Sequence, residues 1–273
     1  MSGPDRVRDG PAAPPTVAAA APPRPARLLV MTRDCVYADA ALRRLSASQA
    51  LELVGLMRSV RPFRDRDGPL ATLAAFNRLC GPRYTLHLVA TSVAIPGLSR
   101  WRTLSAWAGR LRVPVHSTRD ANDDDSRSFV EACAPDLVLC VDFNHILKTA
   151  VLEASPRRRF FNLHPSLLPR HRGHDPVFHG MLAGDGSFGF TVHALAPRVD
   201  TGAIAIRREV PVAGLGLAAR YVALFAAGAE AFAEAIARHG VEVPTRPQEG
   251  EPNANTYPTP DEVRAFLAAS HRF

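Results

Sequence analysis

The sequence has few of the residues that mark disulfide-stabilised or metal-bound proteins. Its four cysteines, Cys35, Cys80, Cys133 and Cys140, show no short paired spacing, which fits buried thiols in a reducing cytosol better than disulfides or a zinc motif. No stretch reaches the uninterrupted apolar length of a membrane span, and the N-terminus has no continuous apolar segment like that of a signal peptide. We therefore expect a soluble, cytoplasmic protein without a membrane partner.

Lysine is almost absent. Of the 33 basic residues only Lys148 is a lysine, although the formal net charge is +7 and the pI is about 9.9. A basic protein of this kind could bind nucleic acid, an anionic membrane surface or an acidic substrate. The near-exclusive use of arginine indicates genome composition rather than a phosphate-binding design, so nucleic acid is not the expected partner.

Low-complexity sequence is confined to the two ends of the chain. Residues 1–26 are rich in Pro and Ala and lack hydrophobic periodicity, which predicts a disordered leader. The hydrophobic content of 47% is ample for one large core, which we assign to a catalytic domain over residues 27–245. Residues 246–273 are predicted to form a Pro-, Gly- and Asn-rich tail with a last short helix over 261–268.

Apolar runs alternate with helical patterns through the domain. Strands are predicted over 27–31, 84–91, 113–115, 136–141, 159–164, 189–195 and 204–212. Helices are predicted over 37–60, 69–79, 101–111, 126–134, 146–154, 175–182 and 217–239. This alternation implies right-handed crossovers and an open, mostly parallel, Rossmann-like α/β sheet with helices on both faces. Ligands are then expected beyond the C-terminal ends of the strands.

The candidate catalytic residues begin in the strand over 159–164. Asn162 and His164 share one face of this strand because side chains alternate, and an amide and an imidazole on an apolar strand need polar partners. Asp200 opens a polar turn between two later strands. A donor for a carbonyl oxygen, a group that titrates near neutrality and a carboxylate to orient it are what acyl transfer to an amine requires. Taken singly, a core histidine and an Asx turn explain His164 and Asp200 as well.

Neither a metal site nor a serine nucleophile is predicted. The other histidines close to His164 in the chain are His171, His174, His179 and His193. None has an H-x-x-x-H spacing supported by nearby carboxylates or thiols in a zinc pattern. Ser166 lacks the G-x-S-x-G sequence that surrounds a hydrolase nucleophile.

The motif that begins at Asn162 resembles the signature of 10-formyltetrahydrofolate-dependent formyltransferases, which include methionyl-tRNA, glycinamide ribonucleotide and sugar N-formyltransferases. The matching positions are Asn-x-His-x-Ser-Leu-Leu-Pro over 162–169, Arg172-Gly173, Pro176, Gly184-Asp185, Gly189, Thr191, His193 and Asp200-Thr201-Gly202. The match is strongest over 136–206. It implies an enzyme that uses 10-formyltetrahydrofolate as co-substrate, without a metal, to formylate an amine.

By position, the resemblance implies a role for each catalytic candidate. Asn162 would hold the formyl oxygen, His164 would stabilise the oxyanion, and Asp200 would orient His164 and relay the proton of the amine. The implied folate contacts are Phe143, Ile146, Leu147, Ser166, Leu167, Leu168, Pro169 and Val199. The implied contacts of the acceptor are Arg172, Gly173, Thr201 and Gly202.

Departures from the family pattern reduce the number of acceptors that the resemblance allows. Asp142 and Asn144 stand where the family often has glycines, and Phe188 stands where it has a threonine, so folate contacts there are expected to differ. Thr32–Cys35 is not a Gly-rich phosphate loop, which argues against glycinamide ribonucleotide. Residues 240–273 are too few for the C-terminal barrel of methionyl-tRNA enzymes, which argues against tRNA.

The expected activity is therefore N-formylation of a small metabolite, such as an amino sugar nucleotide or a biosynthetic intermediate. A formyltetrahydrofolate hydrolase, in which water replaces the amine, is the first alternative. A catalytically silent folate- or RNA-binding protein is the second, against which the intact Asn162, His164 and Asp200 count. The oligomeric state stays open, with a homodimer through the Ala-rich helix or the terminal helix as one alternative.

Overall fold

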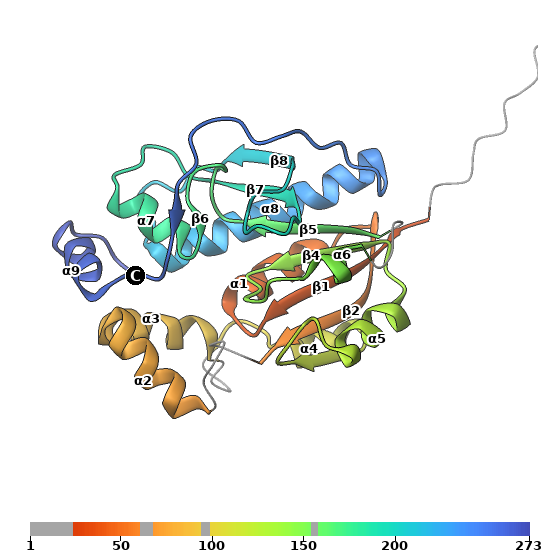
Figure 1. The fold of residues 1–273 in the computed structure, drawn as a ribbon, viewed down its shortest axis with the longest axis horizontal. Coiled ribbons are helices and arrows are strands. Elements are labelled where there is room, and N and C mark those ends of the chain that lie inside the picture. Colours follow the sequence, from red (N-terminus) through yellow and green to blue (C-terminus); the bar gives the residue numbers. More distant parts are fainter. Residues whose placement is uncertain (1–23, 61–67, 94–98, 154–157) are drawn as a thin grey trace, which may run out of the picture.

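The short apolar runs of the sequence pair into one seven-stranded sheet, in the order β3-β2-β1-β4-β5-β7-β8. The computed structural model describes residues 24–60, 68–93, 99–153 and 158–273. The parallel strands are β1 (Ala26–Arg33), β2 (Leu51–Ser59), β3 (Val115–Thr118), β4 (Leu137–Val141) and β5 (Arg159–His164). β7 (Gly189–Ala194) runs antiparallel to β5, and β8 (Ile204–Glu209) runs antiparallel to β7. This confirms the predicted open, mostly parallel α/β sheet (Figure 1).

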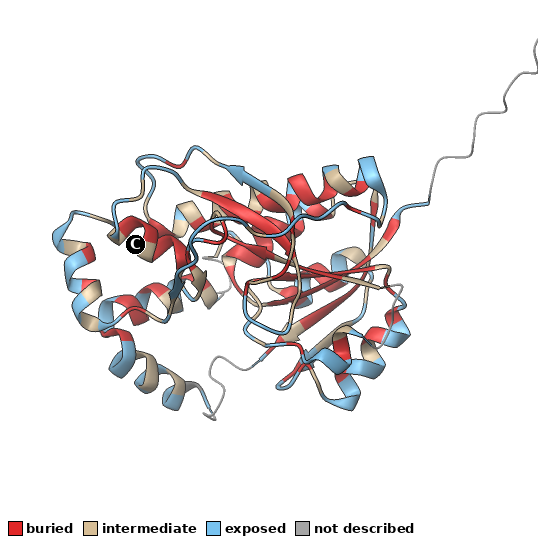
Figure 2. Cartoon of the chain, turned by 45° about the horizontal axis from the view of Figure 1, so that its top comes forward, coloured by how far each residue is buried: buried red, intermediate tan, exposed pale blue. Residues whose placement is uncertain are grey.

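Successive residues of the buried strands point into two different cores. Leu28 and Val30 of β1 belong to one hydrophobic cluster, whereas Leu29 and Met31 belong to another. Because strand side chains alternate, these clusters lie on opposite faces of the sheet. The first cluster includes α1 (Val36–Leu45), α4 (Leu104–Leu111) and α8 (Leu217–His239), and the second includes α5 (Asp124–Cys133) and α6 (Thr149–Leu152). Helices therefore cover both faces, with the buried strands between them (Figure 2).

Residues 51–59 are a strand, so the predicted helix over 37–60 is wrong in its second part. Helix α1 ends at Leu45, and β2 pairs with β1 on one side and with β3 on the other. A buried parallel strand is apolar on both faces, and periodicity alone cannot separate such a run from a helix. A Cβ on Gly55 would lie 2.6 Å from the Sγ of Cys133, so this glycine allows the close packing of α5 on β2.

The prediction of a strand over 84–91 is wrong, because these residues lie in the helix α3 (Pro82–Ser92), which follows α2 (Pro69–Cys80). Gly81, with φ of 80°, ends α2, and Pro82 starts the next helix, where its missing N–H costs nothing. The helix buries a face that mixes polar and apolar residues, so its hydrophobic pattern does not identify it as a helix. The buried residues of α3 are Tyr84, Thr85, His87 and Thr91.

The predicted helix over 146–154 is reduced to α6. Asn122 prevents an earlier start, because its side chain donates to the carbonyl of Ile146 at 3.1 Å and accepts from the N–H of Lys148 at 2.7 Å. These backbone groups are then not free for helical hydrogen bonds. Residues 154–157 lie outside the described residues.

The C-terminal residues pack beside α2 and α3. Helix α9 (Pro260–Ala268) begins with a capping box between Thr259 and Glu262, which confirms the predicted last helix. The ring of Phe273 lies 5.7 Å from that of Tyr84 on α3. Together α2, α3 and α9 form a helical lobe at one side of the sheet (Figure 1). Arg33, the last residue of β1, joins the sheet to this lobe by donating to Ser92 at 3.0 Å.

Other predictions about the chain ends and cysteines have mixed outcomes. The four cysteines are free and buried, as expected. Of the predicted leader, residues 1–23 lie outside the described residues. Arg24 forms two hydrogen bonds with Asp136, at 2.9 and 3.0 Å, and β1 already begins at Ala26. Among the described helices, none has both the length and the apolar composition that crossing a membrane requires.

Replacing Gly228 by alanine tests the packing of α8 on the sheet. A Cβ on Gly228 would lie 2.3 Å from the Cδ1 of Leu163, which is itself buried, so overpacking should cost about 1–3 kcal/mol. The gain in helix propensity is only about 1 kcal/mol. Gly109→Ala in α4 is the control, because nothing lies within 4 Å of its added Cβ. Urea denaturation should show Gly228→Ala less stable than wild type and Gly109→Ala at least as stable; the reverse order would contradict this packing.

Candidate active site

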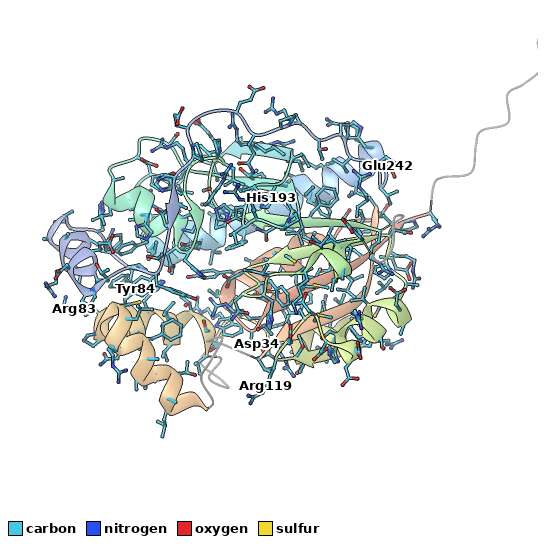
Figure 3. The ribbon with its side chains drawn as sticks, viewed as in Figure 1. Asp34, Arg83, Tyr84, Arg119, His193 and Glu242 are labelled. Carbon is cyan, nitrogen blue, oxygen red and sulfur yellow. The ribbon has the colours of Figure 1, made fainter. Side chains whose placement is uncertain are left out.

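The ends of β5 and β7 bring the three catalytic candidates together. In the antiparallel pairing, Asn162 lies opposite His193. The Nδ2 of Asn162 lies 3.3 Å from the Oδ1 of Asp200 and 3.2 Å from the Nε2 of His193. The Nδ1 of His164 lies 3.6 Å from the Oδ2 of Asp200. Asn162, His164, His193 and Asp200 thus form one cluster, which we call the polar cluster; Figure 3 labels His193.

Asp200 is a buried anion. Its Oδ2 accepts a hydrogen bond from the backbone N–H of Gly173 at 2.8 Å, and its Oδ1 lies 3.3 Å from the Nε2 of His193. Burial disfavours the charged form, but the imidazoles of His164 and His193 and the Gly173 N–H outweigh it and hold the pKa of Asp200 below its ordinary value. Asp200 is therefore ionised throughout the neutral pH range.

His164 is held as a neutral imidazole with a defined basic atom. Its Nε2 lies 2.8 Å from the carbonyl oxygen of His171, and because a carbonyl only accepts, this nitrogen carries the hydrogen. Burial lowers the pKa of His164, although Asp200 and the His171 carbonyl oppose it. The Nδ1 atom is therefore the proton acceptor, and it faces the carboxylate of Asp200.

A segment after α8 holds the loops of the polar cluster together. The Nε2 of Gln248 donates to the carbonyls of Asp200 and Gly202, at 2.8 and 2.9 Å, and its Oε1 accepts from Arg172 at 2.7 Å. Further on, β9 (Ala254–Asn255) pairs with β6 (Arg172–Gly173). We call residues 246–255 the strap.

Hydrogen bonds from side chains of β7 and β8 hold the Ser-Leu-Leu-Pro segment, residues 166–169, in place. The hydroxyl of Thr191 donates to the carbonyl of Ser166 at 2.7 Å and accepts from the N–H of Leu168 at 3.1 Å. Arg207 donates to the carbonyl of Leu168 at 2.8 Å. Ser166, Leu168 and Pro169 are buried and Leu167 is half-buried, so the segment presents mainly its backbone and Leu167.

The two loops expected to contact folate expose apolar side chains. Ile146, in the loop after β4, is 57% exposed, and Val199, just before Asp200, is 51% exposed. Phe143 is half-buried, with its ring 4.8 Å from that of His145, while Leu147 is buried. These two loops therefore offer the uncovered apolar surface that an aromatic ligand would need.

The residues expected to contact the acceptor have structural roles as well. A Cβ on Gly202 would lie 1.7 Å from the carbonyl oxygen of Ala194, and one on Gly173 would lie 2.3 Å from that of Asn255. Only glycine therefore permits these two close backbone approaches. Thr201 donates to the carbonyl of Arg198 at 2.9 Å. The Nε of Arg172 is buried and has no hydrogen-bond partner among the described residues.

Two residues of the site are not among the predicted catalytic or binding residues. His193 matches a position of the family motif without a predicted role, and it pairs directly with Asn162. Gln248 gives no signal, because it lies in a stretch without hydrophobic periodicity whose partners are distant in the sequence. In the described part of the chain, no group of three or more His, Cys, Asp and Glu side chains is arranged to hold a metal ion.

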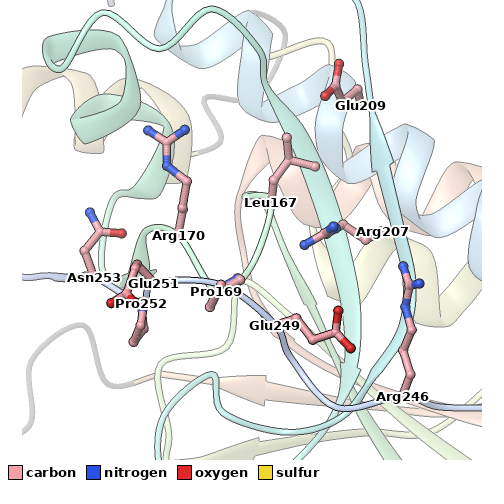
Figure 4. A pocket seen from close by; sticks show the side chains of 11 residues that line it. Leu167, Pro169, Arg170, Arg207, Glu209, Arg246, Glu249, Glu251, Pro252 and Asn253 are labelled. Carbon is pink, nitrogen blue, oxygen red and sulfur yellow. The ribbon is translucent and has the colours of Figure 1, made fainter.

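A cavity of about 700 Å³ lies between the strap, the Ser-Leu-Leu-Pro segment and β8 (Figure 4). Its charged lining residues are Arg170, Arg207, Glu209, Arg246, Glu249 and Glu251. Asn162, His164 and Asp200 do not line it. The cavity is therefore separate from the polar cluster.

Comparison with known proteins assigns the family. The family described as "Formyl transferase" matches residues 102–221, which contain β5, β7 and the Asp200 turn. Over 209 residues the chain is 32% identical to a methionyl-tRNA formyltransferase from Clavibacter sepedonicus, and the match covers 74% of this chain and 68% of that protein. The chain belongs to the formyltransferase family. This confirms the resemblance and makes the protein a member of a family of enzymes.

Solved formyltransferases share the fold. A 4-N formyltransferase from Francisella tularensis gives a TM-score of 0.55 at 14% identity, over 85% of this chain and 76% of that one. A glycinamide ribonucleotide transformylase from Symbiobacterium toebii gives 0.52 at 18% identity, over 83% and 95%. The chain spans 35% of the length of a methionyl-tRNA formyltransferase from Anaplasma marginale and 60% of one from Thiobacillus denitrificans.

The buried, neutral His164 should make stability depend on pH. The folded pKa of His164 lies below the ordinary value of 6.5, so the unfolded chain takes up the proton first and stability falls as the pH drops below about 6.5. Urea denaturation at pH 7.5 and 5.5 should show a smaller loss for His164→Asn than for wild type. Some loss will remain, because burial also lowers the pKa of His87 to about 4. An equal loss in both proteins would contradict this account of His164.

Proposed function

We propose that the protein transfers a formyl group from 10-formyltetrahydrofolate to the amine of a small metabolite, such as an amino sugar nucleotide or a biosynthetic intermediate. The polar cluster carries this proposal. It joins an amide donor, a neutral imidazole and an anionic carboxylate through contacts of 3.3 Å between Asn162 and Asp200 and 3.6 Å between His164 and Asp200. Those are the groups that formyl transfer to an amine needs.

Asn162 would bind the formyl oxygen. Its two Nδ2 contacts, at 3.2 and 3.3 Å, are longer than the usual hydrogen bond of about 2.9–3.0 Å. A formyl oxygen that becomes negative as the amine attacks is a stronger acceptor than His193, and it can take over one of these hydrogens. A donor placed at a developing oxyanion commonly lowers a barrier by about 3–4 kcal/mol.

His164 and Asp200 would handle the proton. When the amine nitrogen bonds to the formyl carbon, the amine must lose one proton, and N10 of the folate must gain one as its bond to that carbon breaks. The Nδ1 of His164 can accept the proton, because its Nε2 is committed to the His171 carbonyl. The Oδ2 of Asp200 at 3.6 Å stabilises the resulting imidazolium, which in turn stabilises the oxyanion.

The folate would lie across the loop after β4 and the loop before Asp200. The exposed Ile146 and Val199 supply apolar surface there. Asp142, which replaces a glycine common in the family, has φ of 49°, so it keeps a backbone conformation that usually requires glycine. Its Oδ2 accepts from Arg33 at 2.8 Å. Asp142 therefore adopts a left-handed backbone conformation at the start of this loop without being a glycine.

We infer a small acceptor because the helical lobe stands beside the C-terminal edge of the sheet, where ligands of such sheets bind. Helix α3 contacts α1 and is tied to the end of β1 through Arg33 and Ser92, so helices stand beside the C-terminal edge of the sheet. The second candidate is the amino group of methionyl-tRNA, which the names of the relatives in sequence suggest.

The experiment measures tetrahydrofolate release from 10-formyltetrahydrofolate, with amino sugar nucleotides, other small amines, glycinamide ribonucleotide or methionyl-tRNA. Asn162→Ala and Asp200→Asn should each lower amine-dependent release by about 100- to 1,000-fold. His239→Ala, at the exposed end of α8, is the control and should retain the wild-type rate. Release without any amine would favour the hydrolase, and full turnover in Asn162→Ala would contradict the proposed chemistry.

A further inference from the structure

Asp175 stands at a helix start but does not cap the helix. It precedes α7 (Pro176–Leu182), has left-handed φ and ψ of 48° and 47°, and makes no side-chain hydrogen bond to that helix. Aspartate is favoured at such positions because its carboxylate accepts from N–H groups of the first turn. Asp123 does this for α5, where it accepts from Ser126 at 2.7 Å. Asp175 makes no such capping hydrogen bond to α7, and its left-handed backbone conformation costs free energy.

The carboxylate of Asp175 is turned toward α3. Its Oδ1 accepts a hydrogen bond from the hydroxyl of Tyr84, which Figure 3 labels. Its Oδ2 is buried and has no hydrogen-bond partner among the described residues. A buried carboxylate oxygen without a donor has lost its hydrogen bonds to water, and no protein hydrogen bond compensates for this loss. Burial accordingly raises the pKa of Asp175.

The position of Asp175 is beside the polar cluster, toward the first strand. It lies two residues after Gly173, whose N–H binds Asp200. The negative charge of Asp142, at the end of β4, adds to the effect of burial in raising the pKa of Asp175. The strand order changes direction between β1 and β4, and open α/β sheets bind ligands at such switch points. Asp175 therefore lies where the second substrate of a formyl transfer would be expected.

The basic side chains around Asp175 already have partners elsewhere. Arg33, at the end of β1, forms an ion pair with Asp142 at 2.8 Å. His174 stacks on the ring of Tyr257 at 4.2 Å, and the Nε2 of His179 lies 2.9 Å from the carbonyl oxygen of Thr256. In the described part of the chain, Asp175 has no ion pair with a basic side chain. A hydrogen-bond donor for its Oδ2 would therefore have to come from a ligand.

We propose that Asp175 is the acceptor-binding carboxylate, whose Oδ2 receives an N–H or O–H donor of the acceptor. This inference rests on the proposed formyl transfer. It selects a class of substrate: amines that carry a second hydrogen-bond donor, which is a hydroxyl in an amino alcohol or amino sugar and an ammonium in a diamine. Simple alkylamines have no second donor for the buried Oδ2 of Asp175. They are therefore poor acceptors.

The test compares small amines as acceptors at saturating 10-formyltetrahydrofolate. The donor-bearing probes are ethanolamine, aminopentanol, ethylenediamine and cadaverine, and the matched alkylamines are propylamine and hexylamine. For wild type, kcat/KM should be at least about 10-fold higher for the best donor-bearing probe than for its alkylamine, the effect of one hydrogen bond to a charged group. Asp175→Ala should remove this ratio. Asp175→Asn should keep it for hydroxyl probes and lose it for ammonium probes, which separates the two donors.

Asp123→Ala is the matched control, because it removes a true helix cap away from the polar cluster. It should lower the melting temperature and leave the ratio unchanged. A ratio near one in wild type, or an unchanged ratio in Asp175→Ala and Asp175→Asn, would overturn the inference. If no amine supports release by wild type, formyl transfer is what fails. The binding of the same probes without folate is then measured by melting temperature. Donor-bearing amines should raise the melting temperature of wild type but not of Asp175→Ala. The absence of this shift in wild type would also overturn the inference.

Discussion

The structure around the polar cluster depends on keeping the carboxylate of Asp200 buried and ionised. A charge removed from water needs several donors at short range. Here the donors come from segments far apart in the sequence: the Nδ2 of Asn162 at the end of β5 and the backbone N–H of Gly173. β7 matters for the polar cluster because its antiparallel pairing with β5 places His193 opposite Asn162.

The same requirement explains the glycines and the strap. Gly173 and Gly202 let two loops approach neighbouring backbone more closely than any side chain would allow. Gln248 then satisfies the carbonyls of Asp200 and Gly202, and links them to Arg172. The strap thus fixes the two loops that carry Asp200 and Gly173, although it takes no part in the proposed chemistry. Asp175 differs from Asp200, because one of its two carboxylate oxygens is buried without a donor.

Much of the fold could be predicted from local patterns, and the failures have physical causes. The run Leu137–Val141 is predictable as a buried strand because it is uniformly apolar and short. Leu51–Ser59 is largely apolar too but follows a helix closely, so its period does not distinguish strand from helix. The region over 84–91 is predicted as a strand, yet Gly81 and Pro82 start a helix whose buried face includes Tyr84 and His87.

The candidate site divides in the same way. Asn162 and His164 could be found because two polar side chains on one face of an apolar strand require partners, and Asp200 followed from the family motif. Gln248 and the free oxygen of Asp175 depend on contacts between distant segments, and no local pattern encodes them. The expected folate and acceptor contacts remain predictions, although the exposed Ile146 and Val199 agree with the first group.

A crystal structure of the protein with a folate analogue whose formyl group cannot be transferred would test the role of the polar cluster. We expect a formyl oxygen at hydrogen-bond distance, about 3 Å, from the Nδ2 of Asn162, with the His164 imidazole beside it. The pterin should lie between the loops that carry Ile146 and Val199. An analogue bound elsewhere, or a formyl oxygen turned away from both Asn162 and His164, would show that the polar cluster does not perform formyl transfer.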